Sequence, residues 1–213
     1  MKKTIIGIVL SVTLVLAGCN IGSSIEQQLS ETMTVMNSAE KEYREAQAKL
    51  TDIEKIEQQL FNETMKLTQQ QQDELAAKVT ELEQFLEQRL DYLNEEDTSI
   101  EKAKVSVGDF DALIEKADDD AKQQIEELKN AIIKRYELHS AFVSEYQKLA
   151  TLQRELYGML RAEETQLPEL KDKVNAVNAQ NETVQSAVTS FNESTERVNV
   201  LKDDVFANFQ QEK

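Results

Sequence analysis

The sequence predicts an all-α fold, an antiparallel up-and-down bundle of long helices. Turn-forming residues are scarce, since the 213 residues include only five glycines and one proline. Ala, Leu, Glu, Gln and Lys are abundant, and these side chains lose little conformational freedom in a helix. Apolar residues also recur at alternating steps of three and four, the spacing of one helical face. Together these observations predict long helices with few corners.

The N-terminus carries an export signal ahead of the helices. A positively charged start, Met1-Lys2-Lys3, precedes an apolar segment from Thr4 to Leu16. A helix that spans a bilayer needs about 20 apolar residues, so a segment of this length is typical of a signal peptide. We predict a signal peptide at residues 1–18, a lipidated tether at residues 19–24 and a helical bundle domain at residues 25–213.

The end of the apolar segment, Leu16-Ala17-Gly18-Cys19, matches the lipobox of bacterial lipoproteins. We therefore expect cleavage between Gly18 and Cys19 and a diacylglyceryl group on the Cys19 thiol; the alternative is an ordinary secretory leader with an incidental cysteine. Two acyl chains, such as palmitate, contribute about 0.8 kcal/mol per buried methylene and form a durable anchor. The predicted location is the extracytoplasmic face of the cell membrane. Cys19 is the only cysteine, so the mature chain has no disulfide and no thiol for catalysis or metal binding.

The first predicted helix has two interleaved apolar series at steps of seven residues, and it ends where the pattern fails at residues 68–73. Heptad series of this kind are typical of coiled-coil packing. The series are Leu29, Met36, Tyr43 and Leu50, and Ala39, Ala46, Ile53, Leu60 and Leu67.

The second predicted helix resumes at Leu75 and keeps one apolar series from Val79 to Ile114 without a miss. Arg89 and Glu96 interrupt its other series. The frame passes through Gly108, which we interpret as a helix residue costing about 1 kcal/mol relative to Ala. The helix should end at Asp118-Asp119-Asp120, because Asp is a preferred N-cap for the helix that follows.

A third helix follows these aspartates and ends near Pro168. Proline disfavours a helical conformation at the residue before it and is itself favoured in the first turn of a helix, so we expect a fourth helix to begin there. On the apolar stripe of the fourth helix, Asn181 and Thr195 are polar, and polar residues at such positions usually fix register. The apolar stripes are Ile125, Leu128, Ile132, Phe142, Tyr146, Leu149, Leu156 and Leu160 in the third helix, and Leu170, Val177, Val184, Phe191, Val198 and Val205 in the fourth.

These boundaries give four helices of about 45 residues, each about 65 Å long. Similar lengths suit an up-and-down bundle. A three-helix alternative would keep residues 68–73 helical as a stutter, but its first helix would be about twice as long as its partners. We prefer four helices.

Charge excludes one large class of partner. The formal net charge is −16, and the mature chain without Lys2 and Lys3 carries 22 basic and 40 acidic side chains, for a net charge of −18. Nucleic-acid binding needs a concentrated basic surface. We expect no nucleic-acid partner.

Residues that could support catalysis are few. His139 is the only histidine, which excludes a two-histidine zinc site within one chain. Neither a Gly-x-Ser-x-Gly elbow nor a glycine-rich phosphate loop is present, and Asp118-Asp119-Asp120 lacks the spacing of a calcium loop. His139 falls on the apolar stripe, where we interpret it as a histidine at the core edge, with pH sensing as the alternative. We expect no enzyme activity, no cofactor and no metal.

Three stretches carry a resemblance to a known family: Glu57 to Thr64 (EQQLFNET), Arg135 to Leu149 (RYELHSAFVSEYQKL) and Leu167 to Val174 (LPELKDKV). With the lipobox, they resemble the YkyA-type cell-wall-binding lipoproteins of low-GC Gram-positive bacteria. The resemblance covers nearly the whole mature chain. It implies a surface-anchored helical bundle without enzyme activity, with the cell wall (peptidoglycan or teichoic acid) as its partner.

Three function hypotheses follow: a wall-binding module, an adaptor that binds another exported protein through a helical face, and an envelope enzyme without a recognisable motif. Wall binding meets an electrostatic difficulty, because teichoic acids and this chain are both anionic. Direct adhesion would need bridging Mg²⁺ or Ca²⁺, a basic patch such as Lys129, Lys134 and Arg135, or sugar contacts from exposed tyrosines.

Overall fold

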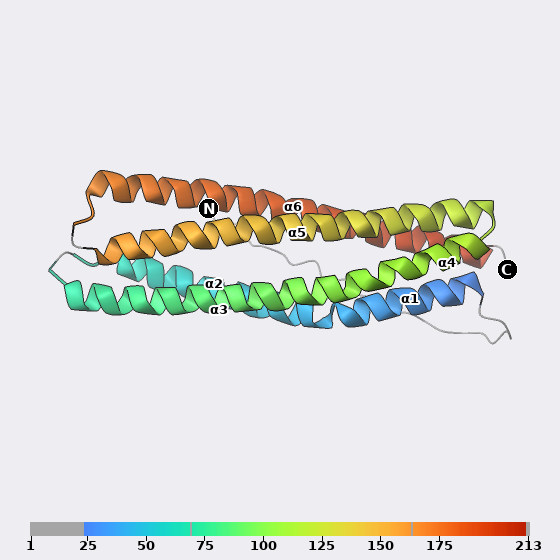
Figure 1. The fold of residues 1–213 in the computed structure, drawn as a ribbon, viewed down its shortest axis with the longest axis horizontal. Helices are drawn as coiled ribbons and strands as arrows, with labels where there is room; N and C mark the ends of the chain where they lie inside the picture. Colours follow the sequence, from blue (N-terminus) through green and yellow to red (C-terminus); the bar gives the residue numbers. More distant parts are fainter. Residues whose placement is uncertain (1–23, 69, 163, 212–213) are drawn as a thin grey trace. The chain divides into compact units, whose positions relative to one another are not determined.

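The computed structural model describes residues 24–68, 70–162 and 164–211, and every regular element among them is helical (Figure 1). The predicted signal peptide, the Gly18–Cys19 cleavage site and lipidated Cys19 lie outside these residues.

The order of elements confirms the all-α prediction and the preference for four long helices. The first two predicted helices are each interrupted once, and the last two are continuous. The three-helix alternative is wrong, because a connection separates Thr64 from Gln72. The elements are α1 (Ile25–Ala39), α2 (Lys41–Thr64), α3 (Gln72–Val105), η1 (Ser106–Gly108), α4 (Asp109–Lys116), α5 (Asp119–Arg161) and α6 (Leu167–Gln211).

The chain forms two compact units. Among the described residues, unit 1 contains 24–42, 98–140 and 188–211, and unit 2 contains 43–97 and 141–187. Unit 1 therefore holds α1, the end of α3 with η1 and α4, the first half of α5 and the second half of α6. Unit 2 holds most of α2 and α3, with the complementary halves of α5 and α6.

Neighbouring helices of unit 2 are antiparallel, because residue numbers fall along one helix as they rise along its partner. The α2–α3 and α5–α6 connections accordingly lie at the same end of this unit (Figure 1). The contacts that show this are Lys49–Glu95 and Lys78–Glu63 between α2 and α3, Arg154–Glu87 and Arg161–Glu83 between α3 and α5, and Lys173–Glu155 and Gln180–Glu145 between α5 and α6.

Side-chain caps fix two helix starts. The Ser24 hydroxyl accepts a hydrogen bond from the Gln27 amide at the start of α1. The Asp118 carboxylate accepts one from the Ala121 amide at the start of α5, which confirms the predicted cap. Both interactions satisfy amides that have no partner within the helix.

The uninterrupted α-helix expected through Gly108 is wrong in detail, since residues 106–108 form a 3₁₀ turn. A 3₁₀ helix has three residues per turn, so side chains three apart align. Val107, Phe110 and Leu113 are buried at this spacing. The tightened turn thus brings Leu113 into the core in place of the expected Ile114, which is half-buried.

Candidate functional site

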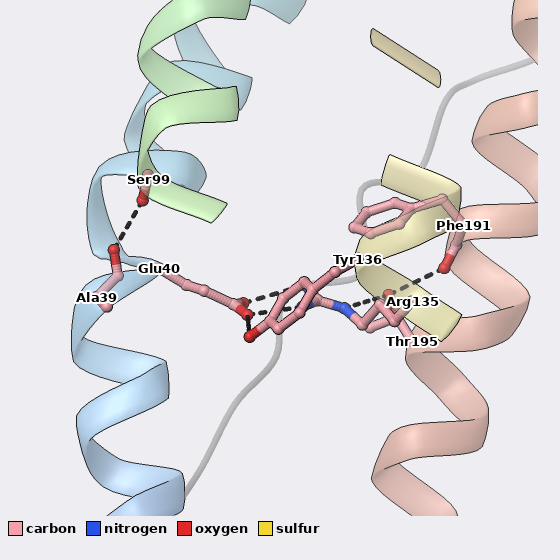
Figure 2. A network of polar contacts seen from close by, with 7 residues as sticks. All are labelled: Ala39, Glu40, Ser99, Arg135, Tyr136, Phe191 and Thr195. Atoms are coloured by element: carbon pink, nitrogen blue, oxygen red, sulfur yellow. Dashed lines mark hydrogen bonds and ion pairs between the residues drawn. The ribbon is translucent and has the colours of Figure 1, made fainter. Parts of the chain in front are cut away.

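A buried polar network in unit 1 lies at the break between α1 and α2. The Glu40 side chain is buried there and accepts hydrogen bonds from α5. Arg135 donates from Nη1 to Glu40 Oε1 at 2.6 Å and from Nη2 to Oε2 at 3.0 Å, and Tyr136 Oη donates to Oε1 at 2.9 Å (Figure 2). This bidentate geometry is the strongest arrangement of an arginine and a carboxylate.

Arg135 also joins this break to α6. Its Nε donates to Thr195 Oγ1 at 2.9 Å, and the Thr195 hydroxyl donates to the Phe191 carbonyl at 3.0 Å. The guanidinium carbon lies 4.9 Å from the centroid of the Phe191 ring, a cation–π contact. One arginine thus contacts two other chain segments.

The backbone at the break is satisfied from α3. A carbonyl at the end of a helix has no partner within that helix. Ser99 Oγ donates to the Ala39 carbonyl at 2.7 Å (Figure 2). The interruption of the first predicted helix is therefore stabilised by a side chain from α3, which binds the carbonyl that has no partner within the helix.

Unit 2 contains a second buried network, made from other residues. Arg89 on α3 donates from Nη1 to Glu57 Oε2 at 2.6 Å and from Nε to Tyr146 Oη at 2.8 Å. Tyr157 Oη donates to Glu57 Oε1 at 2.6 Å, and Tyr146 Oη donates to Glu54 Oε1 at 2.5 Å. The network joins α2, α3 and α5.

Burial and charge act together on the titratable groups of these networks. Burial, followed by the nearby carboxylates, raises the pKa of Tyr136, Tyr146 and Tyr157 above the usual value of 10.0. Burial alone would lower the pKa of Arg89, but the oxygens of Tyr146 and Glu57 outweigh it and raise this pKa. The tyrosines therefore stay protonated as donors and Arg89 stays charged.

These networks can hold helices in register, and their central charged groups are buried. Glu40, Glu57, Arg89 and Arg135 are each at most 4% exposed. A hollow of about 10 Å³ beside Glu40, lined in part by Met36 and Asn37, has room for about one water. Within the described part of the chain, no group of three or more His, Cys, Asp or Glu side chains could hold a metal ion.

The structure places His139 fully inside the core of unit 1. Its ring meets the Phe191 ring edge-on, with centroids 5.4 Å apart. The interpretation as a histidine at the core edge understates its burial. Of the two polar stripe residues on the fourth predicted helix, Thr195 is buried as expected, whereas Asn181 is exposed, so its predicted core position is wrong.

The predicted basic patch is not formed. Arg135 is buried against Glu40, Lys129 pairs with Asp111, and Lys134 pairs with Glu137. Arg135 lies at the apolar spacing of α5 and therefore points inward, so that it is buried while the adjacent Lys134 side chain is 62% exposed.

The tyrosines are also mostly unavailable at the surface. Tyr43, Tyr136, Tyr146 and Tyr157 are buried, and Tyr92 is half-buried. The Lys49 ammonium lies 5.3 Å from the centroid of the Tyr92 ring and 3.7 Å from a Glu95 carboxylate oxygen. We call Lys49, Tyr92 and Glu95 the α2–α3 surface cluster; it is the place on unit 2 where a tyrosine reaches solvent.

None of the described helices is long and apolar enough to cross a bilayer.

A family model described as "Putative cell-wall binding lipoprotein" matches residues 24–208. The chain belongs to the YkyA family.

Two similar proteins place this family assignment in context. The "Uncharacterized lipoprotein YkyA" of Bacillus subtilis (strain 168) is 27% identical over 208 residues, which cover 94% of this chain and 90% of the relative. A crystal structure of a conserved protein of unknown function from Staphylococcus aureus is similar with a TM-score of 0.73, covering 85% of this chain and 91% of that one. At 17% identity, the second likeness shows the helical fold alone.

Proposed function

We propose that this YkyA-family protein is a lipoprotein anchored through Cys19 on the extracytoplasmic face of the membrane, where it binds the cell wall without catalysing a reaction. The observation that carries the proposal is the family match over residues 24–208, joined to the Leu16-Ala17-Gly18-Cys19 motif. The two buried networks support the non-enzymatic part of the proposal, because their charged groups are hydrogen-bonded to other network residues inside the core.

Wall contact has to overcome repulsion between an anionic protein and anionic teichoic acid. The described residues contain no preformed metal cluster, so divalent cations would act by screening and bridging separate surface carboxylates. The α2–α3 surface cluster offers a complementary route, since Tyr92 presents part of an aromatic ring and Lys49 is 54% exposed. Such a cluster suits a sugar with a nearby negative charge.

Co-sedimentation with purified cell walls tests the proposal. The mature chain is mixed with intact walls and with walls stripped of teichoic acid, each with and without Mg²⁺. We expect pelleting with intact walls and more of it with Mg²⁺. If the protein stays in the supernatant in all four conditions, direct wall binding is wrong and the adaptor hypothesis takes its place.

A pair of lysine variants tests the contact site. Lys49→Gln should reduce pelleting several-fold, whereas Lys102→Gln should not. Lys102 is a matched control because it is 57% exposed and pairs with Glu42, as Lys49 pairs with Glu95. Equal losses in both variants would mean that net charge governs binding, and soluble wall fragments released during the incubation would contradict the absence of enzyme activity.

A further inference from the structure

The first part of α6, residues 167–187, packs differently from the rest of the same helix. Val184 is the only buried residue in this segment, and Leu167 is 77% exposed. The second part of α6 contributes a row of core residues to unit 1: Phe191, Thr195, Val198, Leu201 and Val205.

Two buried groups of unit 2 are formed without this segment, which adds only the buried side chain of Val184 to the unit. One apolar cluster comes from α2, α3 and α5 alone, and so does the buried polar network of Glu54, Glu57, Arg89, Tyr146 and Tyr157. The apolar cluster consists of Leu60, Val79, Leu82, Leu86, Ala150 and Tyr157, with Phe61, Leu75, Phe85, Leu90 and Leu160 packed against it.

Two sets of polar contacts join residues 167–187 to α5, and neither is fully buried. Leu170, Val174 and Val177 are half-buried. Lys173 pairs with Glu155 at 2.5 Å, and the Gln180 amide donates to the Glu145 side chain at 2.8 Å and to its carbonyl at 3.0 Å. Glu155 is 50% exposed, and ion pairs at such positions contribute little to stability.

We propose that residues 167–187 open from the α2, α3 and α5 core of unit 2 as a local unit, while the second part of α6 stays packed in unit 1. Local opening of this kind occurs where few apolar side chains are buried. The open state exposes the stripe of Leu170, Val174 and Val177.

Amide hydrogen exchange of the full mature protein tests the opening directly. Amides of residues 167–187 should exchange at least about 100-fold faster than those of residues 188–205, which share the same helix. They should also exchange faster than amides of α3 and α5 in unit 2. Exchange within about threefold across the whole of α6 would overturn the proposal.

Two matched valine variants distinguish local opening from global unfolding. Val184 and Val198 are each 3% exposed and lie in the same series of seven-residue steps. Val184→Ala should speed exchange of residues 167–187 about tenfold and leave the urea midpoint and the α3 amides unchanged, whereas Val198→Ala should lower the midpoint. An equal loss of midpoint in both variants, with faster α3 exchange in Val184→Ala, would show that the segment unfolds only with the whole unit.

Discussion

Arg135 and Glu40 are buried charges, and each is tolerable in the core because of the other. Removing an ion from water costs several kcal/mol even after the protein relaxes, and only close, well-directed hydrogen bonds offset that cost. The two Arg135–Glu40 contacts at 2.6 and 3.0 Å meet this condition. The pair therefore specifies the alignment of α5 with the α1–α2 break more than it adds net stability.

Removing one partner should be more harmful than removing both. Arg135→Ala leaves Glu40 buried without its cation and should cost about 3–5 kcal/mol of unfolding free energy. Replacing both residues, as in Glu40→Leu with Arg135→Met, should cost only about 1–3 kcal/mol, because the buried Tyr136 hydroxyl is then the group left without its acceptor. Urea unfolding measures both, with Lys102→Gln as the exposed-pair control at about 0.5 kcal/mol or less. A double variant as unstable as the single one would contradict this account.

The buried tyrosines predict a loss of stability at alkaline pH. Burial raises the pKa of Tyr136, Tyr146 and Tyr157 above 10.0, so the folded state favours the protonated phenol. Their contribution is fully present below pH 10 and is lost as pH rises through the higher folded-state pKa values. The urea midpoint should therefore fall above about pH 10, and tyrosinate absorbance should rise together with unfolding. Ionisation of all the tyrosines without unfolding would contradict the prediction.

At the scale of the helices, the sequence pattern locates elements better than it locates their interruptions. The failure of apolar spacing at residues 68–73 and the Asp118 cap both mark real helix ends. The break at Glu40 is invisible to the pattern, because it depends on Arg135 and Tyr136, which are distant in the sequence, and on Ser99 meeting the Ala39 carbonyl.

The buried networks were only partly predictable. Arg89 and Glu96 interrupt an apolar series of the second predicted helix, and both are buried. Glu57 continues the series of Leu29 to Leu50 by one more step of seven, and Arg135 lies seven residues after Leu128. A charged residue at such a position signals a buried network, but the sequence does not name its partner, which comes from another helix.

The 3₁₀ turn at residues 106–108 predicts that one substitution should stabilise the protein. Gly108 has φ −61° and ψ −26°, and a Cβ atom placed there would meet nothing within 4 Å. Gly108→Ala should therefore raise the unfolding free energy by about 0.4–1 kcal/mol, because alanine restricts the unfolded chain more than glycine does. Thermal unfolding measures the gain, and a decrease would mean that the turn needs glycine.

At the scale of the whole molecule, charge determines which partners can approach. The net charge of −18 expected for the mature chain keeps anionic surfaces at a distance unless cations screen it. The cations that the sequence suggested as a patch are used in pairs within the fold. If the protein binds the wall as proposed, binding has to come from a local contact or from Mg²⁺, and the sedimentation comparison with and without Mg²⁺ separates these two.

The Ser24 cap at the start of α1 limits how far the protein can stand from its anchor. If Cys19 is lipidated as proposed, the chain from Cys19 to Ser24 spans at most about 18 Å when fully extended. The first turn of α1 must then remain within that distance of the lipid headgroups. Inserting a flexible segment before Ser24 would lengthen this connection without changing the fold. Such a variant would separate the distance that the protein can reach from its affinity for its binding partner.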